Sequence, residues 1–261
     1  MKEETYLDSI LAFHRERAQR DQRSLDQLLD NLPRLPSRPV TFIEQIKKEK
    51  GLSVIAEIKK KSPSKGVLKP GLNAGHLAKV YEKAGATCIS VLTDTEHFGG
   101  SALDLMAVDK LVNIPILRKD FTVDLRDIYD AKVMGASCIL LIVAALEKGL
   151  LTESIELCNQ LGLDALVETH DESEVEIAIE SGAELIGINQ RDLQTFEVDQ
   201  SRALRVVGEI PKHITKVAES GIRKLSDAKP LRPAGFDAVL IGESLVKSEN
   251  PEILIKQLRK L

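Results

Sequence analysis

The sequence predicts a single domain of the α/β class, a (β/α)8 barrel in which eight parallel strands close into a cylinder surrounded by helices. Short β-rich runs alternate with stretches of helical periodicity along the chain, and this alternation indicates a parallel sheet. The length of 261 residues fits as well, because such a barrel typically needs about 250 residues. Eight strand–helix units at this length favour closure into a TIM barrel over an open, doubly wound sheet.

The first fifty residues predict a helical extension ahead of the barrel. We therefore expect one domain over residues 1–261, with the extension at 1–50 and the barrel at 51–261. Apolar positions recur at helical spacing in two stripes, Leu7, Ile10, Leu11, His14 and Ala18, and then Leu25, Leu28, Leu29 and Leu32. Helices are expected to stop at Pro33, Pro36 and Pro39. Both stripes should pack on the barrel, because an amphipathic helix buries its apolar face.

A third short helix is expected before the first strand. Thr41 and Glu44 have the spacing of a capping box, for a helix that ends near Gly51.

The barrel strands are predicted from eight β-rich runs, which are Val54–Lys59, Cys88–Leu92, Ile114–Lys119, Cys138–Val143, Ala165–Glu168, Leu185–Asn189, Thr215–Glu219 and Ala238–Ile241. Helical periodicity lies between them, for example at Ala74–Ala84, Leu125–Met134, Leu150–Leu161 and Glu172–Ser181. Glycines stand where these helices should end, at Gly85, Gly135, Gly162 and Gly182. Each suits a left-handed residue that closes a helix before the next strand.

Composition excludes several classes of function. The net charge of −4 and the pI near 5.8 give no basic surface for nucleic acid. The longest apolar run, Cys138–Leu146, is shorter than the roughly 20 residues that cross a bilayer. No apolar leader stands near the N-terminus, and the scattered Cys88, Cys138 and Cys158 read as reduced thiols, so we expect a cytoplasmic protein. Cys138 and Cys158 should be core residues.

Polar side chains gather at the predicted strand ends, where barrels of this class place their active sites. By the two-residue period of a strand, Glu57 and Lys59 share the face that points into the barrel mouth. The same parity gives an inward face to Lys119 and Phe121, to Glu168, and to Asn189 and Arg191. Buried charges are costly unless they pair, so these groups should pair with one another or with a charged substrate.

Each of these residues also has an ordinary structural interpretation. Lys60 and Lys61 fit a solvated face, whereas the inward parity of Lys59 favours function. An exposed turn at Lys119 and a surface position for Glu168 both remain open from the spacing alone. Phe98 and Phe121 are core residues unless they lie above the last layer of the barrel. The five histidines, His14, His76, His97, His170 and His213, show no metal-ligand spacing, so no metal site is expected.

A phosphate site is predicted where the last two strands end. Ser220-Gly221 and Gly242-Glu243 follow strands seven and eight, the place where such barrels often hold a phosphate on backbone N–H groups and the start of a short helix. Glycine lets the anion approach the backbone closely. Either glycine alone could be a turn residue, but the two together favour an anion site.

Four stretches resemble the motifs of the indole-3-glycerol phosphate synthase family. They are IAEIKKKSPS at 55–64, ILRKDF at 116–121, GINQRDL at 187–193 and VAESGI at 217–222. Their order and spacing match, Glu168 lies between the second and third, and the likeness runs from the helical extension to the end of the barrel. The resemblance implies a carboxy-lyase of tryptophan biosynthesis, which makes indole-3-glycerol phosphate, CO2 and water from 1-(2-carboxyphenylamino)-1-deoxyribulose 5-phosphate. It implies no cofactor.

The resemblance also implies roles for individual residues. Lys119 is the general acid of ring closure, Glu168 transfers protons in later steps, and Lys59 lies near the substrate carboxylate and the leaving hydroxyl, with the acid of dehydration left open between the two lysines. Glu57 and Asn189 orient the sugar hydroxyls and the lysines. The polar network is completed by Arg191 and Glu219. The phosphate site matches Ser62, Ser220, Gly221, Gly242 and Glu243. The apolar wall around the aromatic ring matches Phe98, Phe121, Leu140 and Pro63.

Two points of chemistry stay open at the level of sequence. A neighbouring lysine and burial would lower the pKa of Lys119, whereas Glu57 and Glu168 would hold it charged. Glu243 stands where related chains can carry a small hydroxyl residue, so we expect only its backbone N–H to meet the phosphate, with the carboxylate pointing away.

Two rival functions fit part of the pattern. A sugar-phosphate isomerase would share the Ser220-Gly221 and Gly242 features but would not require Lys59, Lys119 and Glu168 together. A non-catalytic barrel that binds phosphorylated metabolites predicts binding without turnover. The expected partner is a small sugar phosphate, and the expected assembly is a monomer or a weak homodimer.

Overall fold

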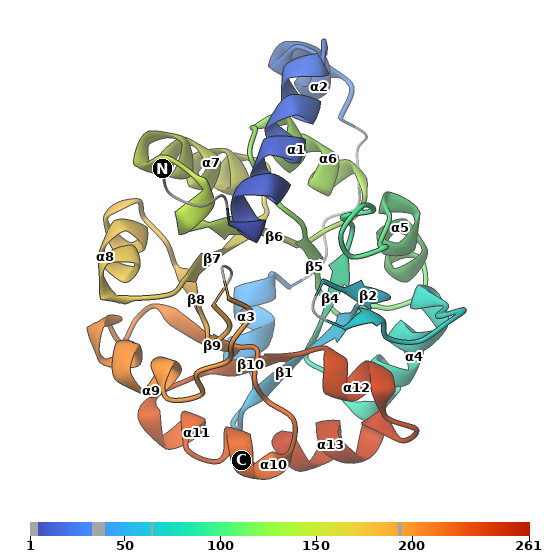
Figure 1. Ribbon diagram of the computed structural model, residues 1–261, viewed down its shortest axis with the longest axis vertical. Helices are drawn as coiled ribbons and strands as arrows, with labels where there is room; N and C mark the ends of the chain where they lie inside the picture. Colours follow the sequence, from blue (N-terminus) through green and yellow to red (C-terminus); the bar gives the residue numbers. More distant parts are fainter. Residues whose placement is uncertain (1–4, 33–39, 64, 193–194) are drawn as a thin grey trace.

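The computed structural model describes residues 5–32, 40–63, 65–192 and 195–261 and confirms the barrel. Eight parallel strands among these residues close into a cylinder, in the order β1-β10-β9-β8-β7-β6-β5-β4 and back to β1 (Figure 1). Ser53 pairs with Ala238 across the closing seam. The predicted helix stops at Pro33, Pro36 and Pro39 lie outside the described residues.

The strands agree with the predicted runs to within two residues at every boundary. They are β1 (Ser53–Ile58), β4 (Cys88–Leu92), β5 (Ile116–Lys119), β6 (Cys138–Ile142), β7 (Asp164–Thr169), β8 (Leu185–Asn189), β9 (Thr215–Glu219) and β10 (Ala238–Ile241). A two-stranded hairpin of β2 (Lys61–Ser62) and β3 (Gly66–Val67) follows β1 at the rim. Since all eight barrel strands are parallel, their carboxyl ends meet at one mouth.

Helices surround the cylinder. They are α4 (Ala74–Ala84), α5 (Ala102–Asp109), α6 (Arg126–Val133), α7 (Lys148–Gln160), α8 (Glu172–Glu180), α9 (Arg202–Val206), α10 (Leu225–Ala228), α11 (Leu231–Ala234), α12 (Glu243–Lys247) and α13 (Pro251–Leu258), with short 3-10 turns η1 (Val143–Ala145) and η2 (Val207–Glu209). The four glycines expected after helices, Gly85, Gly135, Gly162 and Gly182, all have positive φ. The helix-closing role assigned to them is confirmed.

The extension forms α1 (Tyr6–Arg20), α2 (Leu25–Asp30) and α3 (Phe42–Lys47). The first predicted stripe does pack on the barrel: Leu7, Ile10 and Leu11 are buried. The second does not, because α2 buries no residue, and Leu25 and Leu29 are 37% and 53% exposed. The expectation that both stripes pack on the barrel is therefore wrong for α2, which reaches outward beside α6 (Figure 1).

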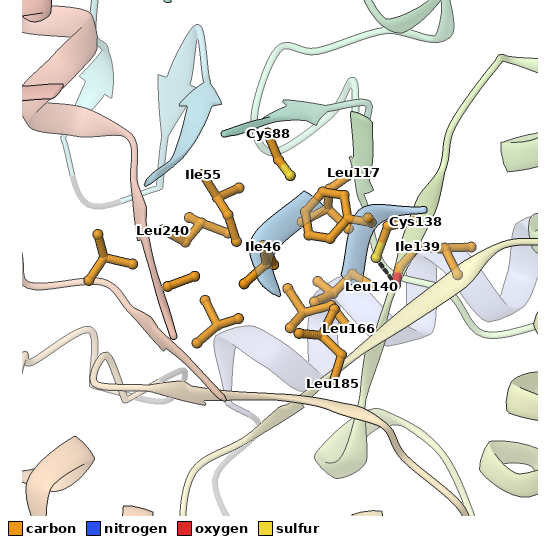
Figure 2. Packing of buried hydrophobic residues seen from close by; sticks show 14 of the residues in the cluster. Ile46, Ile55, Cys88, Leu117, Cys138, Ile139, Leu140, Leu166, Leu185 and Leu240 are labelled. Atoms are coloured by element: carbon orange, nitrogen blue, oxygen red, sulfur yellow. Dashed lines mark hydrogen bonds between the residues drawn. The ribbon is translucent and has the colours of Figure 1, made fainter. Parts of the chain in front are cut away.

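Helix α3 lies in the centre of the ring of strands (Figure 1). Its Ile43 N–H donates to Asp164, the first residue of β7, so α3 covers the end of the barrel opposite the mouth. The predicted capping box is present, with Thr41 accepting from the Glu44 N–H and the Glu44 carboxylate accepting from the Thr41 N–H. Ile46 projects into the barrel core among strand side chains such as Ile55 and Leu166 (Figure 2). Burial of these apolar side chains fixes the inward parity of each strand.

Helix α1 docks at the mouth. Arg15 donates to the carbonyl of Ala145 after β6, and His14 reaches Asp94 after β4. Arg126 on α6 donates to the carbonyl of Ala18 near the end of α1. None of the described helices is both long and apolar enough to span a bilayer.

Candidate active site

A cavity of about 520 Å³ opens at the mouth of the barrel. Its walls come from the ends of strands that are far apart in the sequence. All sixteen predicted site residues line it: Glu57, Lys59, Ser62, Pro63, Phe98, Lys119, Phe121, Leu140, Glu168, Asn189, Arg191, Glu219, Ser220, Gly221, Gly242 and Glu243. Lys60 and Lys61, which the sequence assigned to a solvated face, are not among the lining residues; Lys60 pairs instead with Asp104.

The centre of the cavity is an ammonium between two carboxylates. Lys119 Nζ, at the end of β5, lies 2.9 Å from Glu168 Oε2 on β7 and 2.5 Å from Glu219 Oε2 on β9. Asn189 Nδ2, at the end of β8, donates to Glu168 Oε1 at 3.0 Å. Both carboxylates are almost fully buried, at 2% and 1% exposure. The expected pairing of inward charges is therefore present.

A second lysine–glutamate pair lies across the cavity. Lys59 Nζ, one residue beyond β1, is 2.6 Å from Glu57 Oε2. Gly242 lies beside this carboxylate, and a Cβ added at Gly242 would be 2.0 Å from Glu57 Oε2. The missing side chain of Gly242 thus leaves the space that Glu57 occupies.

The absence of a side chain at Gly187 likewise leaves space for the Glu219 carboxylate. A Cβ added at Gly187, in the middle of β8, would lie 2.1 Å from Glu219 Oε1. That oxygen is buried and, among the described residues, has no hydrogen-bond partner. A buried unpaired oxygen is costly while the carboxylate is charged, which favours a bound proton on Glu219.

The charges of this cluster shift one another's pKa values. Burial alone would lower the pKa of Lys119, but Glu168, Glu219 and Glu57 outweigh it and raise that pKa above its usual range. Burial alone would raise the pKa of Glu168, but Lys119 and His170 lower it to about 2. Burial, with the nearby charges of Glu168 and Glu57, raises the pKa of Glu219 to about 7 despite Lys119. The carboxylates thus decide the question left open by the sequence, and in the free site they hold Lys119 charged.

One end of the cavity is suited to an anion. Ser220 and Gly221, after β9, both have left-handed φ values, of 65° and 76°. Helix α12 begins directly after Gly242. Ser62 Oγ is buried and has no partner among the described residues, so it is available to a ligand. Serine hydroxyls and backbone N–H groups of this kind bind phosphate oxygens.

Three cationic residues that line the cavity, Lys65, Arg223 and Lys247, were missed by the sequence analysis. Lys65 and Lys247 line the cavity, and their ammonium groups lie 2.7 Å and 2.9 Å from Glu243 Oε1. Although burial alone would raise it, these lysines lower the pKa of Glu243 to about 2. The Glu243 carboxylate is therefore paired with two cations, which reduces the repulsion that its charge would exert on a phosphate. The i,i+4 spacing of Glu243 and Lys247 was a signal that could have revealed one of them.

Part of the cavity wall is apolar. Phe98 and Phe121 face each other with ring centroids 6.1 Å apart, and Leu140 and Pro63 add to the same cavity. Phe121 belongs to the buried core and Phe98 packs against that core, and both side chains also line the cavity. Arg191 also lines the cavity, where its guanidinium donates to the carbonyl of Phe196.

The sequence spacing gave no metal site, but the fold brings His14, Asp94 and His97 together beside the mouth, with ligand-type atoms within 4.8 Å of one another. Asp94 Oδ2 lies 2.9 Å from His14 Nε2 and 3.0 Å from His97 Nδ1, so both ring nitrogens carry hydrogens toward it. His14 Nδ1 is buried and has no partner among the described residues, although a metal on Nε2 would require an acceptor there. We therefore infer that this cluster is structural and holds α1 at the mouth of the barrel.

Comparison with known families gives one match over nearly the whole chain. The family model described as "Indole-3-glycerol phosphate synthase" matches residues 7–258. This span includes all of α1 except Tyr6, the barrel and every residue that lines the cavity.

Curated relatives carry the same name. An indole-3-glycerol phosphate synthase of Lachnoclostridium phytofermentans is 44% identical over 86% of this chain and 83% of its own length. Indole-3-glycerol phosphate synthase 1 of Streptomyces coelicolor is 46% identical over 92% of this chain and 89% of its own. The Kineococcus radiotolerans protein of that name is 42% identical over 97% and 94% of the two chains.

Solved structures show similarity of fold. A 3-hexulose-6-phosphate synthase aligns with a TM-score of 0.63 and 15% identity, over 80% of this chain and 99% of that chain. An N-acetylmannosamine-6-phosphate 2-epimerase from Clostridium perfringens aligns with a TM-score of 0.62 and 12% identity, over 81% and 93% of the two chains. At these identities the likeness concerns the barrel and not the reaction.

Proposed function

This chain belongs to the indole-3-glycerol phosphate synthase family, and from that premise we propose how the side chains at the mouth of its barrel carry out the reaction. The protein is a carboxy-lyase of tryptophan biosynthesis. It closes, decarboxylates and dehydrates 1-(2-carboxyphenylamino)-1-deoxyribulose 5-phosphate to give indole-3-glycerol phosphate, CO2 and water. The observation that supports the proposed roles best is the buried ammonium of Lys119 between Glu168 and Glu219.

The substrate lies across the cavity with its two ends in different surroundings. Its phosphate is bound at the end formed by Ser62, Ser220 and Gly221, with the positive charges of Lys65 and Lys247 nearby. Its carboxyphenyl ring packs on the apolar wall of phenylalanine, leucine and proline side chains. This placement brings the sugar carbonyl to the central cluster of charges, where binding in a fixed geometry promotes ring closure.

Lys119 is the general acid of ring closure. As the aromatic carbon attacks the sugar carbonyl, that carbonyl oxygen gains negative charge and takes a proton from the Lys119 ammonium. The alkoxide that develops is a stronger base than an amine, so the transfer is favourable even though nearby carboxylates raise the pKa of Lys119. The positive charge on Lys119 also stabilises the developing oxyanion before the proton moves.

Decarboxylation and dehydration complete the reaction. The bond to the carboxylate carbon breaks, CO2 leaves, and its electron pair restores the aromatic ring. The new hydroxyl then leaves as water, while a proton is removed as the indole double bond forms. Glu168 accepts that proton. Because Lys119 has already given up its own proton, we assign protonation of the leaving hydroxyl to Lys59, which Glu57 holds at the mouth.

Turnover of the proposed substrate tests this function. Mixing protein with the carboxyphenylamino sugar phosphate should produce the absorbance and fluorescence of indole. A sugar-phosphate isomerase would instead interconvert simple sugar phosphates, and a non-catalytic barrel would bind the substrate without consuming it. Either of those results contradicts the assignment.

We also propose that the protein acts in the cytoplasm as a monomer or a weak homodimer. The buried thiols of Cys88, Cys138 and Cys158 support a reducing compartment. Light scattering over a range of protein concentrations tests the assembly, and a concentration-independent higher oligomer would contradict it.

A further inference from the structure

His170 lies next to Glu168, the proposed proton-transfer residue. It follows the last residue of β7, two positions after Glu168, and its side chain is 14% exposed. His170 Nε2 is 3.7 Å from Glu168 Oε1, and His170 Nδ1 is 3.0 Å from Glu174 Oε2 on α8. The imidazole ring therefore stands between two carboxylates, one inside the catalytic cavity and one outside it.

The contacts indicate which ring nitrogens carry hydrogens. Glu174 Oε2 also accepts the backbone N–H of His170 at 2.7 Å, so it is an acceptor and Nδ1 carries a hydrogen toward it. Nε2 is buried and has no hydrogen-bond partner among the described residues. A lone pair on Nε2 would point at the negative charge of Glu168, whereas an N–H there would be attracted to it. The geometry therefore favours the doubly protonated imidazolium.

The wider surroundings agree. Burial alone would lower the pKa of His170, but its hydrogen bond to Glu174 and the charges of Glu168 and Glu174 outweigh burial and raise that pKa. Arg202 acts in the opposite direction. A second cavity of about 350 Å³ adjoins His170, and its charged lining residues are Asp171, Glu172, Glu174, Asp192, Arg202 and Arg205. Glu168 itself is also faced by Lys119, and Glu219 is bound to that lysine from the other side.

We propose that His170 is a positioning residue for Glu168: as an imidazolium between Glu168 and Glu174, it keeps Glu168 ionised and aimed at the substrate. The inference rests on the proposed role of Glu168 and adds a cation that no family motif quoted above contains. Lys119 approaches Oε2 of Glu168 while His170 approaches Oε1, beside Asn189. When ring closure takes the proton of Lys119, the charge of His170 remains, so Glu168 is still ionised for the later step.

The first test measures the titration of His170 directly and does not depend on turnover. The NMR pH titration of the His170 imidazole is recorded in the full-length protein and in the Glu168→Gln variant. Loss of the Glu168 charge should lower the pKa of His170 by about one pH unit or more. Glu174→Gln should lower it as well. An unchanged His170 titration in Glu168→Gln would overturn the proposal, even if the protein is an active synthase.

The second test uses two neutral replacements. His170→Asn can keep the hydrogen bond to Glu174 but cannot carry charge toward Glu168. We expect kcat to fall by about tenfold or more with KM within twofold, and the acid limb of the kcat profile to move to higher pH, because Glu168 then holds its proton more tightly. His170→Gln offers a neutral donor toward Glu168 and should recover part of kcat but not the pH profile.

His213 is exposed and lies before β9, so His213→Asn is the control and should leave kcat and its pH profile unchanged. Wild-type kcat and pH profile in His170→Asn would show that the histidine only supports the fold. A wild-type protein without turnover would instead contradict the proposed function, while the NMR titration would still decide the coupling between His170 and Glu168.

Discussion

Gly242 and Glu57 occupy adjoining space at the seam where β10 meets β1. The Glu57 carboxylate fills the position that a side chain at Gly242 would take, with Oε2 only 2.0 Å from the Cβ that any other residue would add. The same carboxylate holds Lys59. The sequence assigned Gly242 to the phosphate, but the structure gives it a second role in placing the Lys59–Glu57 pair.

Gly242→Ala should therefore impair catalysis through Glu57. We expect kcat to fall about tenfold or more, because Glu57 and Lys59 must move away from the added methyl group. Gly149→Ala in α7 is a matched control: nothing lies within 4 Å of its added Cβ, and alanine in a helix stabilises by about 0.5–1 kcal/mol. Steady-state kinetics and thermal unfolding of both variants check this. Equal activity of Gly242→Ala and wild type would contradict the role of Gly242 in placing Glu57 and Lys59.

Lys119→Ala should lower turnover by several orders of magnitude. The variant loses the ammonium that protonates the sugar carbonyl, while phosphate binding at the far end of the cavity should stay within about threefold. It also leaves Glu168 and Glu219 buried without their cation, which should lower the free energy of unfolding by about 3 kcal/mol. Lys60→Ala, outside the cavity, is the control and should retain turnover. Normal turnover in Lys119→Ala would remove it as the acid.

The double variant Lys65→Ala/Lys247→Ala should weaken substrate binding. Both ammonium groups line the anion end, and their removal also leaves the Glu243 carboxylate uncompensated there. We expect KM to rise about tenfold while kcat changes less than twofold, because the phosphate does not react. Lys61→Ala, whose ammonium contacts the carbonyl of Glu96, is the control. The difference in KM between wild type and the double variant should be smaller at high salt than at low salt, because salt screens the attraction between the two lysines and the phosphate.

The pH dependence of stability should reveal the ionisation of Glu219. Its folded pKa of about 7 is above the ordinary value for glutamate, so its share of stability is present at low pH and is lost as pH rises from about 4.5 through 7. Glu219→Gln stays neutral and should gain about 2 kcal/mol relative to wild type between pH 5 and pH 8. Denaturant unfolding at both pH values measures this difference.

The exposed Glu153→Gln is the control for that measurement and should show the same difference from wild type at both pH values. Glu168 acts in the opposite sense, because its pKa is lowered to about 2. Its share of stability is present above about 4.5 and is lost as pH falls toward 2. A Glu219→Gln variant that gains nothing between pH 5 and pH 8 would mean that Glu219 is ionised throughout that range.

The sequence by itself determined the strands, the ends of the four barrel helices that it predicted and the inward faces. These are local properties: the two-residue period of Ile55, Glu57 and Lys59, the capping box at Thr41 and the closing glycine at Gly85 each depend on residues a few positions apart. Parallel strands then bring their ends to one mouth, so the convergence of Lys59, Lys119 and Glu168 on one cavity also followed from pattern.

Only the tertiary structure decided which atoms meet across that mouth. His14 and Asp94 are 80 positions apart, Lys65 and Glu243 are 178 apart, and no local period links them. The raised pKa of Lys119 likewise depends on carboxylates that closure of the barrel brings beside it. The physical reason is that periodicity fixes the direction of a side chain, whereas distances and burial, which set pairing energies and pKa values, exist only after the cylinder has closed.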